Sequence, residues 1–359
     1  MMKILAPISS IAEVDPLIEA GADEFYCGVL PPVWKKSYTN VASPNRREWS
    51  VSNLKSYDEL NCLVERAHRH SVPVFLTMNA FYSQPQFEAV LKQLELARQA
   101  RVDALIVADL GLLLILQKDW EGVFEIHIST GGTTFNSETA KFYQSLGAKR
   151  VVLPRTVTMT VINTIREKVP DLDLELFILN RGCKNIDGFC TFHHGVNEIL
   201  RRGSWNIPKG WHVDYYFLEV MRRLPLSLAR PLARCGLFGA IGACFLNYRA
   251  ELIPETEGGV EAERKRRIER KLEDNFDVLS GIDPCGAGRY EELAEAGIRS
   301  LKIIGRSNPR SKKIRDVKFL KAVEGAYEQG LRGKDLQRRV QELYRKIYGT
   351  ACLNLCYYP

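Results

Sequence analysis

The stretch Leu293-Ala-Glu-Ala-Gly-Ile-Arg-Ser-Leu-Lys-Ile-Ile-Gly-Arg306 contains the pattern that decides the fold. A helix-like segment ends at Gly297, and a short apolar strand follows it directly. Glycine is favoured just after a helix because it adopts left-handed backbone angles without steric cost. The same order of helix, glycine and strand recurs at Gly21 and Gly147. Helices and strands therefore alternate along the chain, as they do in α/β proteins.

Eight short apolar runs fit this alternation. They are Lys3–Pro7, Glu24–Val29, Val72–Ala80, Ala104–Leu110, Glu125–Thr130, Arg150–Arg155, Asp173–Asn180 and Ser300–Arg306. Their nearly continuous Val, Ile and Leu residues are typical of strands buried on both faces of a parallel sheet. Between two of them, Gln86–Arg101 has helical spacing, and we expect Leu91 and Leu94 on its buried face. We predict a closed (β/α)8 TIM-like barrel, and the alternative is an open doubly wound sheet.

The alternation is interrupted between the seventh and eighth predicted strands. The intervening segment is far longer than a helix with two loops, and such an insertion at the mouth of a barrel is usually functional. We therefore divide the chain into strands one to seven (1–180), a cysteine-bearing insertion over the barrel mouth (181–299), and the last strand with a C-terminal helical extension (300–359). Within the extension, Asp316–Glu328 and Gly333–Tyr348 have the spacing of two helices.

Composition narrows the class of protein. Lys and Arg total 50 against 43 Asp and Glu, and the net charge of +7 suits an acidic small molecule or RNA. No run of about 18 apolar residues is present, so the sequence predicts no transmembrane segment. The N-terminal Met-Met-Lys-Ile-Leu-Ala-Pro enters a strand pattern and lacks the apolar region of a secretory signal. We expect a cytoplasmic protein.

Nine cysteines in a cytoplasmic protein are more typical of metal or redox sites than of disulfides. Cys183 and Cys190 follow the seventh predicted strand, and Cys285 stands before the last one, so all three are expected near the barrel mouth. Thiolates suit iron–sulfur clusters or zinc, but this dispersed spacing is unlike a zinc ribbon. We interpret Cys27 and Cys62 as small hydrophobic core residues.

Polar side chains stand at the predicted carboxyl ends of the strands, where barrels keep their chemistry. These candidate substrate-binding residues are Asn79, Asp109, Ser129, Arg155, Asn180 and Arg306. We expect Arg155, Arg306 and Lys302 to bind an anionic substrate, since guanidinium groups match carboxylate and phosphate geometry. The alternative for Asp109 is a helix cap that pairs with Arg155. His127 lies within a strand, and it is either a substrate ligand or a buried histidine that a neighbour satisfies.

A peptidase would need a nucleophile, a metal or paired carboxylates. The sequence has no His-Glu-x-x-His and no Gly-x-Ser-x-Gly motif. Cys190 with His193 or His194 is the only local arrangement that suits a cysteine protease. The alternative role for these two histidines is beside a metal centre, as proton donors or as partners of its ligands.

Several segments, in order along the chain, resemble the collagenase-like peptidase family, which is peptidase family U32. They are Leu5-Ala-Pro, Glu19–Gly28, Leu105–Gly111, Ile126–Thr130, Arg150–Arg155, Asp283-Pro-Cys and Leu293–Arg306, of which the last is the most specific. The resemblance is to the branch of iron–sulfur proteins that support oxygen-independent hydroxylation of ubiquinone precursors or of tRNA and rRNA bases. It implies an oxidoreductase of the hydroxylase type, acting on a small molecule or an RNA base.

The resemblance also implies a [4Fe–4S] cluster as cofactor, held by four cysteines. Cys183 and Cys190 match the first pair of ligands in the family, and Cys285 matches the last. Cys244 matches the third ligand in part, and its substitutes are Cys235, Cys352 and Cys356. The segment Glu198–Arg234 departs from the typical family pattern. Two alternatives stay open: a peptidase of the same family, and a non-catalytic electron-transfer subunit, for example in a heterodimer with a related chain.

Overall fold

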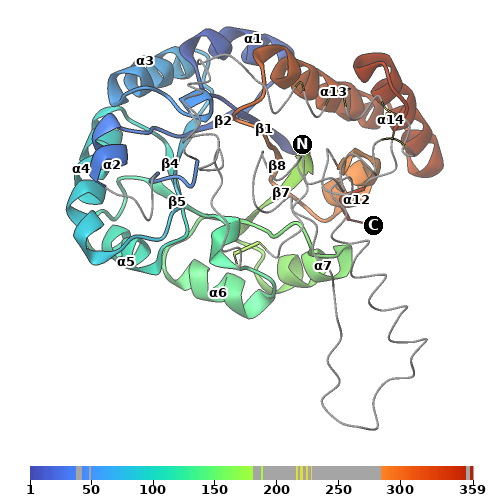
Figure 1. Cartoon of the computed structure of the whole chain (residues 1–359). Coiled ribbons are helices and arrows are strands. Elements are labelled where there is room, and N and C mark those ends of the chain that lie inside the picture. Colours follow the sequence, from blue (N-terminus) through green and yellow to red (C-terminus); the bar gives the residue numbers. More distant parts are fainter. Residues whose placement is uncertain are drawn as a thin grey trace, which may run out of the picture.

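Eight parallel strands form a closed barrel in chain order, from β1 to β8, in the computed structural model (Figure 1). The structure describes residues 1–37, 43–47, 50–180, 187–188, 284–352 and 356–358, with isolated residues between 216 and 228. The expected (β/α)8 barrel is confirmed, and the open sheet is excluded because β1 pairs with both β2 and β8. Most of the predicted insertion 181–299 lies outside the described residues, so its domain boundaries stay a prediction.

The strands follow the predicted runs closely. They are β1 (Lys3–Pro7), β2 (Glu24–Cys27), β3 (Val74–Met78), β4 (Ala104–Val107), β5 (Glu125–Ile128), β6 (Arg150–Val152), β7 (Asp173–Leu179) and β8 (Ser300–Ile303). Every strand except β3 begins at the predicted residue, whereas every strand except β1 ends earlier than predicted. The apolar runs continue into the turns at the barrel mouth, where the polar candidate residues lie.

Helices surround the barrel (Figure 1). They are α1 (Val14–Ala20), α2 (Pro32–Ser37), α3 (Tyr57–His68), α4 (Phe87–Gln99), α5 (Leu110–Asp119), α6 (Ser137–Ser145), α7 (Met159–Lys168), α12 (Tyr290–Glu295), α13 (Arg310–Glu328) and α14 (Gly333–Tyr348). The short 3-10 helices are η1 (Ile11–Glu13), η2 (Ser50–Ser52), η3 (Gln84–Gln86), η4 (Thr130–Gly132) and η8 (Ala287–Arg289). The C-terminal helices α13 and α14 are confirmed, and α13 begins at Arg310 rather than at Asp316. None of the helices in the described ranges combines the length and the apolar character that a membrane span requires.

The glycine pattern is confirmed at all three positions. Gly21, Gly147 and Gly297 have φ angles of 102°, 84° and 67°, in the left-handed region that ends a helix. One predicted helix face was partly wrong, because Leu91 on α4 is 39% exposed whereas Gln93 is buried. Gln93 is satisfied there by Tyr57, whose hydroxyl donates to its amide oxygen. Helical spacing places Leu91 beside the apolar face of α4, but it does not show how far the neighbouring elements cover that face.

The cysteines outside the insertion differ in their surroundings. Cys27 is fully buried at the end of β2, as expected of a small hydrophobic residue, and burial raises the pKa of its thiol to about 12. Cys62 is exposed on the outer surface of α3, so its assignment to the core was wrong. A helix has an outer face as well as an inner one, and Leu60, Leu63 and Val64 occupy the inner face of α3.

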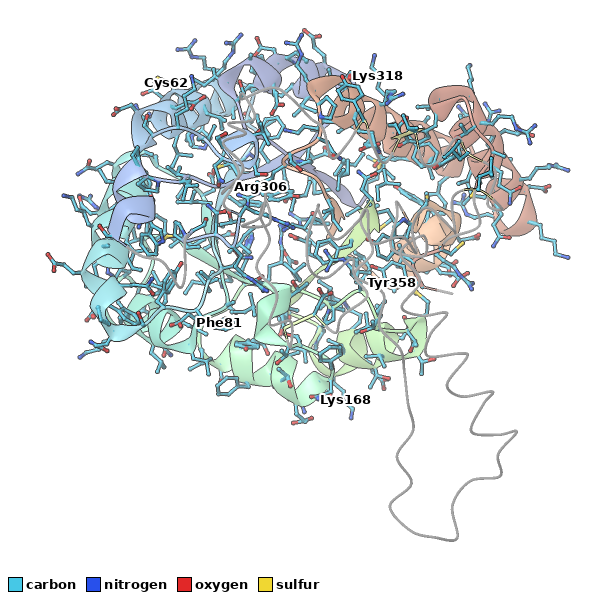
Figure 2. The ribbon with its side chains drawn as sticks, viewed as in Figure 1. Cys62, Phe81, Lys168, Arg306, Lys318 and Tyr358 are labelled. Atoms are coloured by element: carbon cyan, nitrogen blue, oxygen red, sulfur yellow. The ribbon has the colours of Figure 1, made fainter. Side chains whose placement is uncertain are left out.

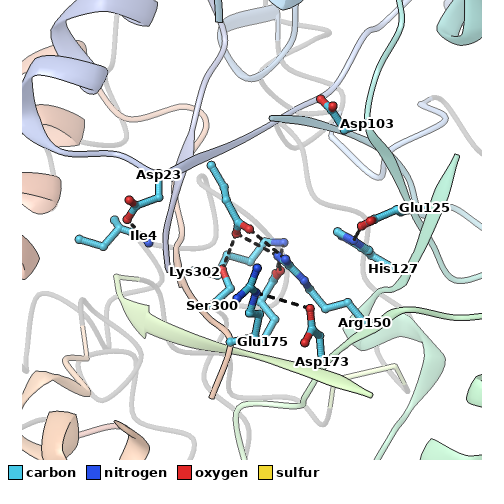
Figure 3. A network of polar contacts seen from close by, with 12 residues as sticks. Ile4, Asp23, Asp103, Glu125, His127, Arg150, Asp173, Glu175, Ser300 and Lys302 are labelled. Atoms are coloured by element: carbon cyan, nitrogen blue, oxygen red, sulfur yellow. Dashed lines mark hydrogen bonds and ion pairs between the residues drawn. The ribbon is translucent and has the colours of Figure 1, made fainter. Parts of the chain in front are cut away.

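The barrel interior holds a small apolar cluster and a network of charges, of which Figure 3 shows the network. The apolar cluster consists of Leu5, Tyr26, Phe75, Ala104 and Ile106. Nearer the amino ends of the strands, the Arg150 guanidinium donates to Glu24 at 2.9 Å through each terminal nitrogen and to Glu175 at 3.1 Å. Lys302 donates to Glu175 at 2.7 Å, and Ser300 donates to Glu24 at 2.7 Å. All these polar side chains are buried, so charges that pair with one another close the amino end of the barrel.

Candidate site at the barrel mouth

Asn79 and Ser129 meet at the mouth, after β3 and β5. The Asn79 amide donates to the Ser129 hydroxyl at 3.1 Å, and that hydroxyl also accepts from the Gly131 amide at 3.3 Å. The buried side-chain oxygen of Asn79 accepts no hydrogen bond within the described part of the chain. Such an acceptor is costly to leave unpaired, and a bound ligand or water that donates to it removes the cost. Within the described residues, Asn79 is therefore a predicted site residue at the mouth with an available hydrogen-bond acceptor.

Asp109 follows β4 and caps α5. One carboxylate oxygen accepts from the Leu112 amide at 2.8 Å, and the other accepts from the Tyr82 amide at 3.1 Å. The capping alternative is therefore what the structure shows. The predicted pairing with Arg155 does not occur, because Arg155 has another partner.

Arg306 lies near the centre of the ring of strands in Figure 2, just after β8. Its guanidinium donates to the Thr77 hydroxyl at 3.0 Å and to the Asn45 side-chain oxygen at 2.9 Å. Burial lowers the pKa of Arg306 from its usual value. The guanidinium passes directly over Gly28, where a Cβ would lie 1.9 Å from a terminal nitrogen of Arg306. Arg306 thus connects β8 with β3 and with the segment after β2, and these bonds occupy the guanidinium that was predicted to bind an anion.

Arg155 follows β6 and binds Asp187, which stands between Cys183 and Cys190 in the sequence. The Asp187 carboxylate accepts from the Arg155 amide at 2.8 Å and also pairs with its guanidinium. The guanidinium lies over the Phe177 ring at 4.0 Å from the ring centre. The next residue, Gly188, has a φ of 90°, and a Cβ there would lie 2.1 Å from the Thr133 side chain. Residues 187–188 therefore contact the mouth at the ends of β5 and β6.

Cys285 lies beside the carboxyl end of β7. It forms isolated bridges with Leu179 and with Cys356, so three chain segments run next to one another here. Burial raises the pKa of the Cys285 thiol to about 12, and the nearby Cys352 and Cys356 contribute to the increase. Among the described residues, no group of three or more Cys, His, Asp or Glu side chains is arranged to hold a metal ion. Cys183, Cys190, Cys235 and Cys244, with His193 and His194, lie outside the described residues, so their roles stay predictions.

Asn180 is buried at the end of β7, whereas His127 and Lys302 are buried inside the barrel, within β5 and β8, and each of the three has a hydrogen-bond partner. One ring nitrogen of His127 is 3.3 Å from Glu125, while the other has no partner within the described part of the chain. Burial lowers the pKa of His127, so the imidazole is neutral near pH 7. Lys302 donates to Glu175, as described above. The Asn180 side chain accepts from Lys312 at 2.6 Å and donates to Asp316 at 2.7 Å, which connects the end of β7 with α13.

The sequence reading missed several of these groups. Glu24, Arg150 and Glu175 form the buried network. Each is a charged residue within an otherwise apolar strand, and this pattern could have predicted buried ion pairs. Tyr357 and Tyr358 are both buried against β7. No sequence pattern indicated this, because each hydroxyl donates to a main-chain oxygen, which every residue type has. The 49% exposed Phe81 ring and the Arg46 guanidinium lie close together over Gly131, in turns that no pattern marked.

Comparison with known proteins gives one matching family and several relatives. The model of peptidase family U32 matches residues 9–204. The tRNA hydroxylation protein P of Haemophilus influenzae is 26% identical over 196 residues, which make up 55% of this chain and 39% of the relative. An uncharacterized protease of Methanocaldococcus jannaschii is 32% identical over 229 residues, or 60% of this chain and 52% of the relative.

A third relative matches over more of the chain. The 23S rRNA 5-hydroxycytidine synthase of Escherichia coli is 29% identical over 331 residues, covering 92% of this chain and 39% of the relative. A solved structure of a U32 peptidase has a TM-score of 0.38 at 17% identity, over 50% of this chain and 69% of the other. The chain spans about half, or less, of the length of these three curated relatives.

Proposed function

The chain belongs to peptidase family U32, and from this membership and its barrel mouth we propose that it supports the hydroxylation of an RNA base or a related organic substrate in the cytoplasm. The observation that carries the proposal is the family match together with two relatives named for hydroxylation of tRNA and rRNA. Another relative is named a protease. The one local arrangement that suits a cysteine protease, Cys190 with His193 or His194, lies outside the described residues, so a peptidase stays the alternative proposal.

We further propose that a [4Fe–4S] cluster is held near the mouth by Cys183, Cys190, Cys285 and a fourth thiolate from Cys244. Cys285 lies at the carboxyl end of β7, and Asp187, between Cys183 and Cys190 in the sequence, contacts the end of β6. Cys285, and the segment that contains Cys183 and Cys190, are thus both attached to the carboxyl end of the barrel. The raised pKa of Cys285 keeps its thiol protonated near pH 7, and a bound metal ion would be needed to stabilise the thiolate. When bound, such a cluster supplies one-electron transfer.

The substrate would lie beside this centre, over the ends of β3 and β5. The unpaired oxygen of Asn79 would accept a hydrogen bond from an amino or hydroxyl group of the substrate. The exposed Phe81 ring, close to Gly131, offers a surface on which a planar base would stack. The neighbouring Arg46 adds a positive charge that suits a phosphate. These groups support recognition of a base through one polar contact and one aromatic face.

Anaerobic purification with iron and sulfide analysis tests the cluster. Wild-type protein is expected to be brown, with about four iron and four sulfide per chain, the composition of this cluster type. Cys183→Ala and Cys285→Ala should lose the iron, whereas Cys62→Ala, on the outer surface of α3, should keep it. A colourless wild-type protein, whether loaded with zinc or free of metal, would refute the cluster.

Mass spectrometry of cellular nucleosides tests the substrate. Deleting the gene should remove one hydroxylated nucleoside from tRNA or rRNA, and a plasmid copy should restore it. An Asn79→Ala copy should fail to restore it, while Asn61→Ala, outside the barrel on α3, should restore it fully. An unchanged nucleoside profile in the deletion strain would exclude an RNA base and leave a small organic substrate.

A further inference from the structure

The C-terminal segment Cys356–Tyr358 lies against the two parts of the chain that lead to the predicted cluster ligands. We propose that Tyr357 and Tyr358 are positioning residues of the metal centre. The inference rests on the cluster of the proposed function. It adds that the C-terminal segment, rather than the barrel alone, fixes Cys285 and the point at which the chain leaves β7 toward Cys183.

The first contact is with β7. The Tyr357 hydroxyl donates to the main-chain oxygen of Asn180 at 2.6 Å, and the Tyr358 hydroxyl donates to that of Phe177 at 2.7 Å. Tyr357 is 5% exposed and Tyr358 only 1%, so both bonds are shielded from water. Asn180 is three residues before Cys183 in the sequence. The bond from Tyr357 therefore holds the last described residue before the first predicted ligand.

The second contact is with Cys285. The Tyr357 amide donates to the main-chain oxygen of Cys285 at 3.2 Å. On the other side of this strand-like segment, the Gly286 amide donates to Ile178 at 2.8 Å, and Pro284 accepts from the Asn180 amide at 3.1 Å. Residues 284–286 thus lie between β7 and the C-terminal segment and bond to both. Without the C-terminal segment, Cys285 would lose one of the two neighbours that hold its main chain.

Close packing and a fourth hydrogen bond also hold the C-terminal segment in place. A Cβ on Gly286 would lie 2.9 Å from Ile178 and 3.3 Å from the Tyr358 ring, so a larger residue at position 286 would push the segments apart. The Arg289 guanidinium donates to the main-chain oxygen of Tyr358 at 3.1 Å. Tyr358 also lies near the Arg155–Asp187 pair, which contributes to its electrostatic surroundings. The C-terminal segment is therefore packed against the Cys285 segment and is close enough to Arg155 and Asp187 for their charges to act on it.

Partners that orient metal ligands commonly change metal retention about 10- to 100-fold when they are removed. The double variant Tyr357→Phe/Tyr358→Phe keeps both rings and removes both hydroxyl bonds. It should still assemble the cluster anaerobically, but lose iron to a chelator about 10-fold faster than wild type. Its reduced cluster should also give a shifted electron paramagnetic resonance spectrum, because the C-terminal segment beside Cys285 loses both hydroxyl bonds that fasten it to the end of β7.

Tyr82→Phe is the matched control. The Tyr82 hydroxyl donates to the main-chain oxygen of Pro44 at 2.7 Å, and the residue is also buried. The control removes the same kind of bond at a place remote from Cys285. It should lower thermal stability to a similar extent while leaving the iron release rate and the spectrum unchanged. A general loss of stability would affect all variants alike.

Cys356→Ser separates positioning from ligation. The main-chain bond and both tyrosines remain in this variant, so it should retain the cluster. Complete loss of iron in Cys356→Ser would make Cys356 a ligand and overturn a purely positioning role for the segment. A wild-type cluster with unchanged release and spectrum in the double tyrosine variant would overturn this inference alone. Wild-type protein without iron would refute the cluster itself, and the inference with it.

Discussion

Arg150→Met is the perturbation that tests the charge network inside the barrel most directly. Arg150 makes three hydrogen bonds, two to Glu24 and one to Glu175. Methionine keeps an unbranched apolar side chain and removes the charge, its donors and the contact of the guanidinium with the Phe75 ring. Glu24 would keep the Ser300 hydroxyl as its partner, and Glu175 would keep Lys302. The variant therefore leaves Glu24 without a cation and weakens the pairing of Glu175.

Removing one partner of a buried ion pair costs about 3–5 kcal/mol, because the remaining charge is both desolvated and unpaired. We expect the free energy of unfolding to fall by about that amount at pH 7, since Glu24 and Glu175 are both buried. Lys302 and Arg150 outweigh burial and hold the pKa of Glu175 below its usual value. A lowered pKa in the folded state stabilises the protein above the unfolded pKa, about 4.3, and this contribution is lost as the pH falls. The cost of Arg150→Met should therefore be smaller in acid than at pH 7.

Urea unfolding followed by circular dichroism measures the change. The matched control is Arg98→Met, which breaks an exposed pair with Glu95 on α4 and should leave the midpoint unchanged. Adding Glu24→Gln to Arg150→Met removes the unpaired charge and should restore part of the lost stability. The reasoning is refuted if Arg150→Met matches wild type within about 0.5 kcal/mol, the range of neutral surface substitutions. It is also refuted if Glu24→Gln gives no recovery.

Three further changes test individual contacts. Gly28→Ala places a Cβ against the Arg306 guanidinium, so urea unfolding should show a loss of about 1–3 kcal/mol, whereas Gly288→Ala, with open space around it, should be neutral. Because burial lowers the pKa of His127, the folded protein resists protonation and stability is lost as the pH falls below about 6.5. His127→Gln should make unfolding curves at pH 7 and pH 5 more alike, and an unchanged difference would contradict this. Asp109→Ala should lower stability by about 1 kcal/mol through the lost α5 cap, and Asp109→Asn should recover most of it; equal losses would exclude capping.

The barrel could be predicted from the sequence because its signals are local. A strand buried on both faces needs a run of apolar residues, and a helix that ends before it needs a residue such as Gly297 with left-handed backbone angles. Strand ends were predicted too late because the apolar runs of Val29, Leu110 and Leu153 continue beyond the paired residues. Val29 and Leu153 are buried beyond the paired residues, whereas Leu110 begins α5 and is 47% exposed. An apolar run in the sequence does not show at which residue the strand pairing stops.

The partners at the candidate site could not be predicted, because they are remote in sequence. Arg306 binds Asn45, which is 261 residues away, and Tyr358 binds Phe177 across 181 residues. The sequence predicted that Arg155 binds an anionic substrate, with pairing to Asp109 as the alternative, whereas its guanidinium pairs with Asp187. Only the closed topology shows which strand ends are neighbours. The ligand cysteines stay predictions for the same reason, since their assignment depends on the resemblance and not on a local pattern.

The placement of the charges limits how this mouth would recognise a substrate. The two arginines predicted to bind an anion, Arg155 and Arg306, already hold residues 187–188 and the segment around Asn45. A substrate anion that displaced either guanidinium would have to replace several bonds, and Asp187 or Thr77 would lose its partner. In the proposed function, recognition over β3 and β5 would therefore use the Asn79 oxygen and the exposed Phe81 ring, with Arg46 as the remaining positive charge beside the ring. Such a surface favours a planar, hydrogen-bonding ring over a compact anion, which agrees with a base as substrate.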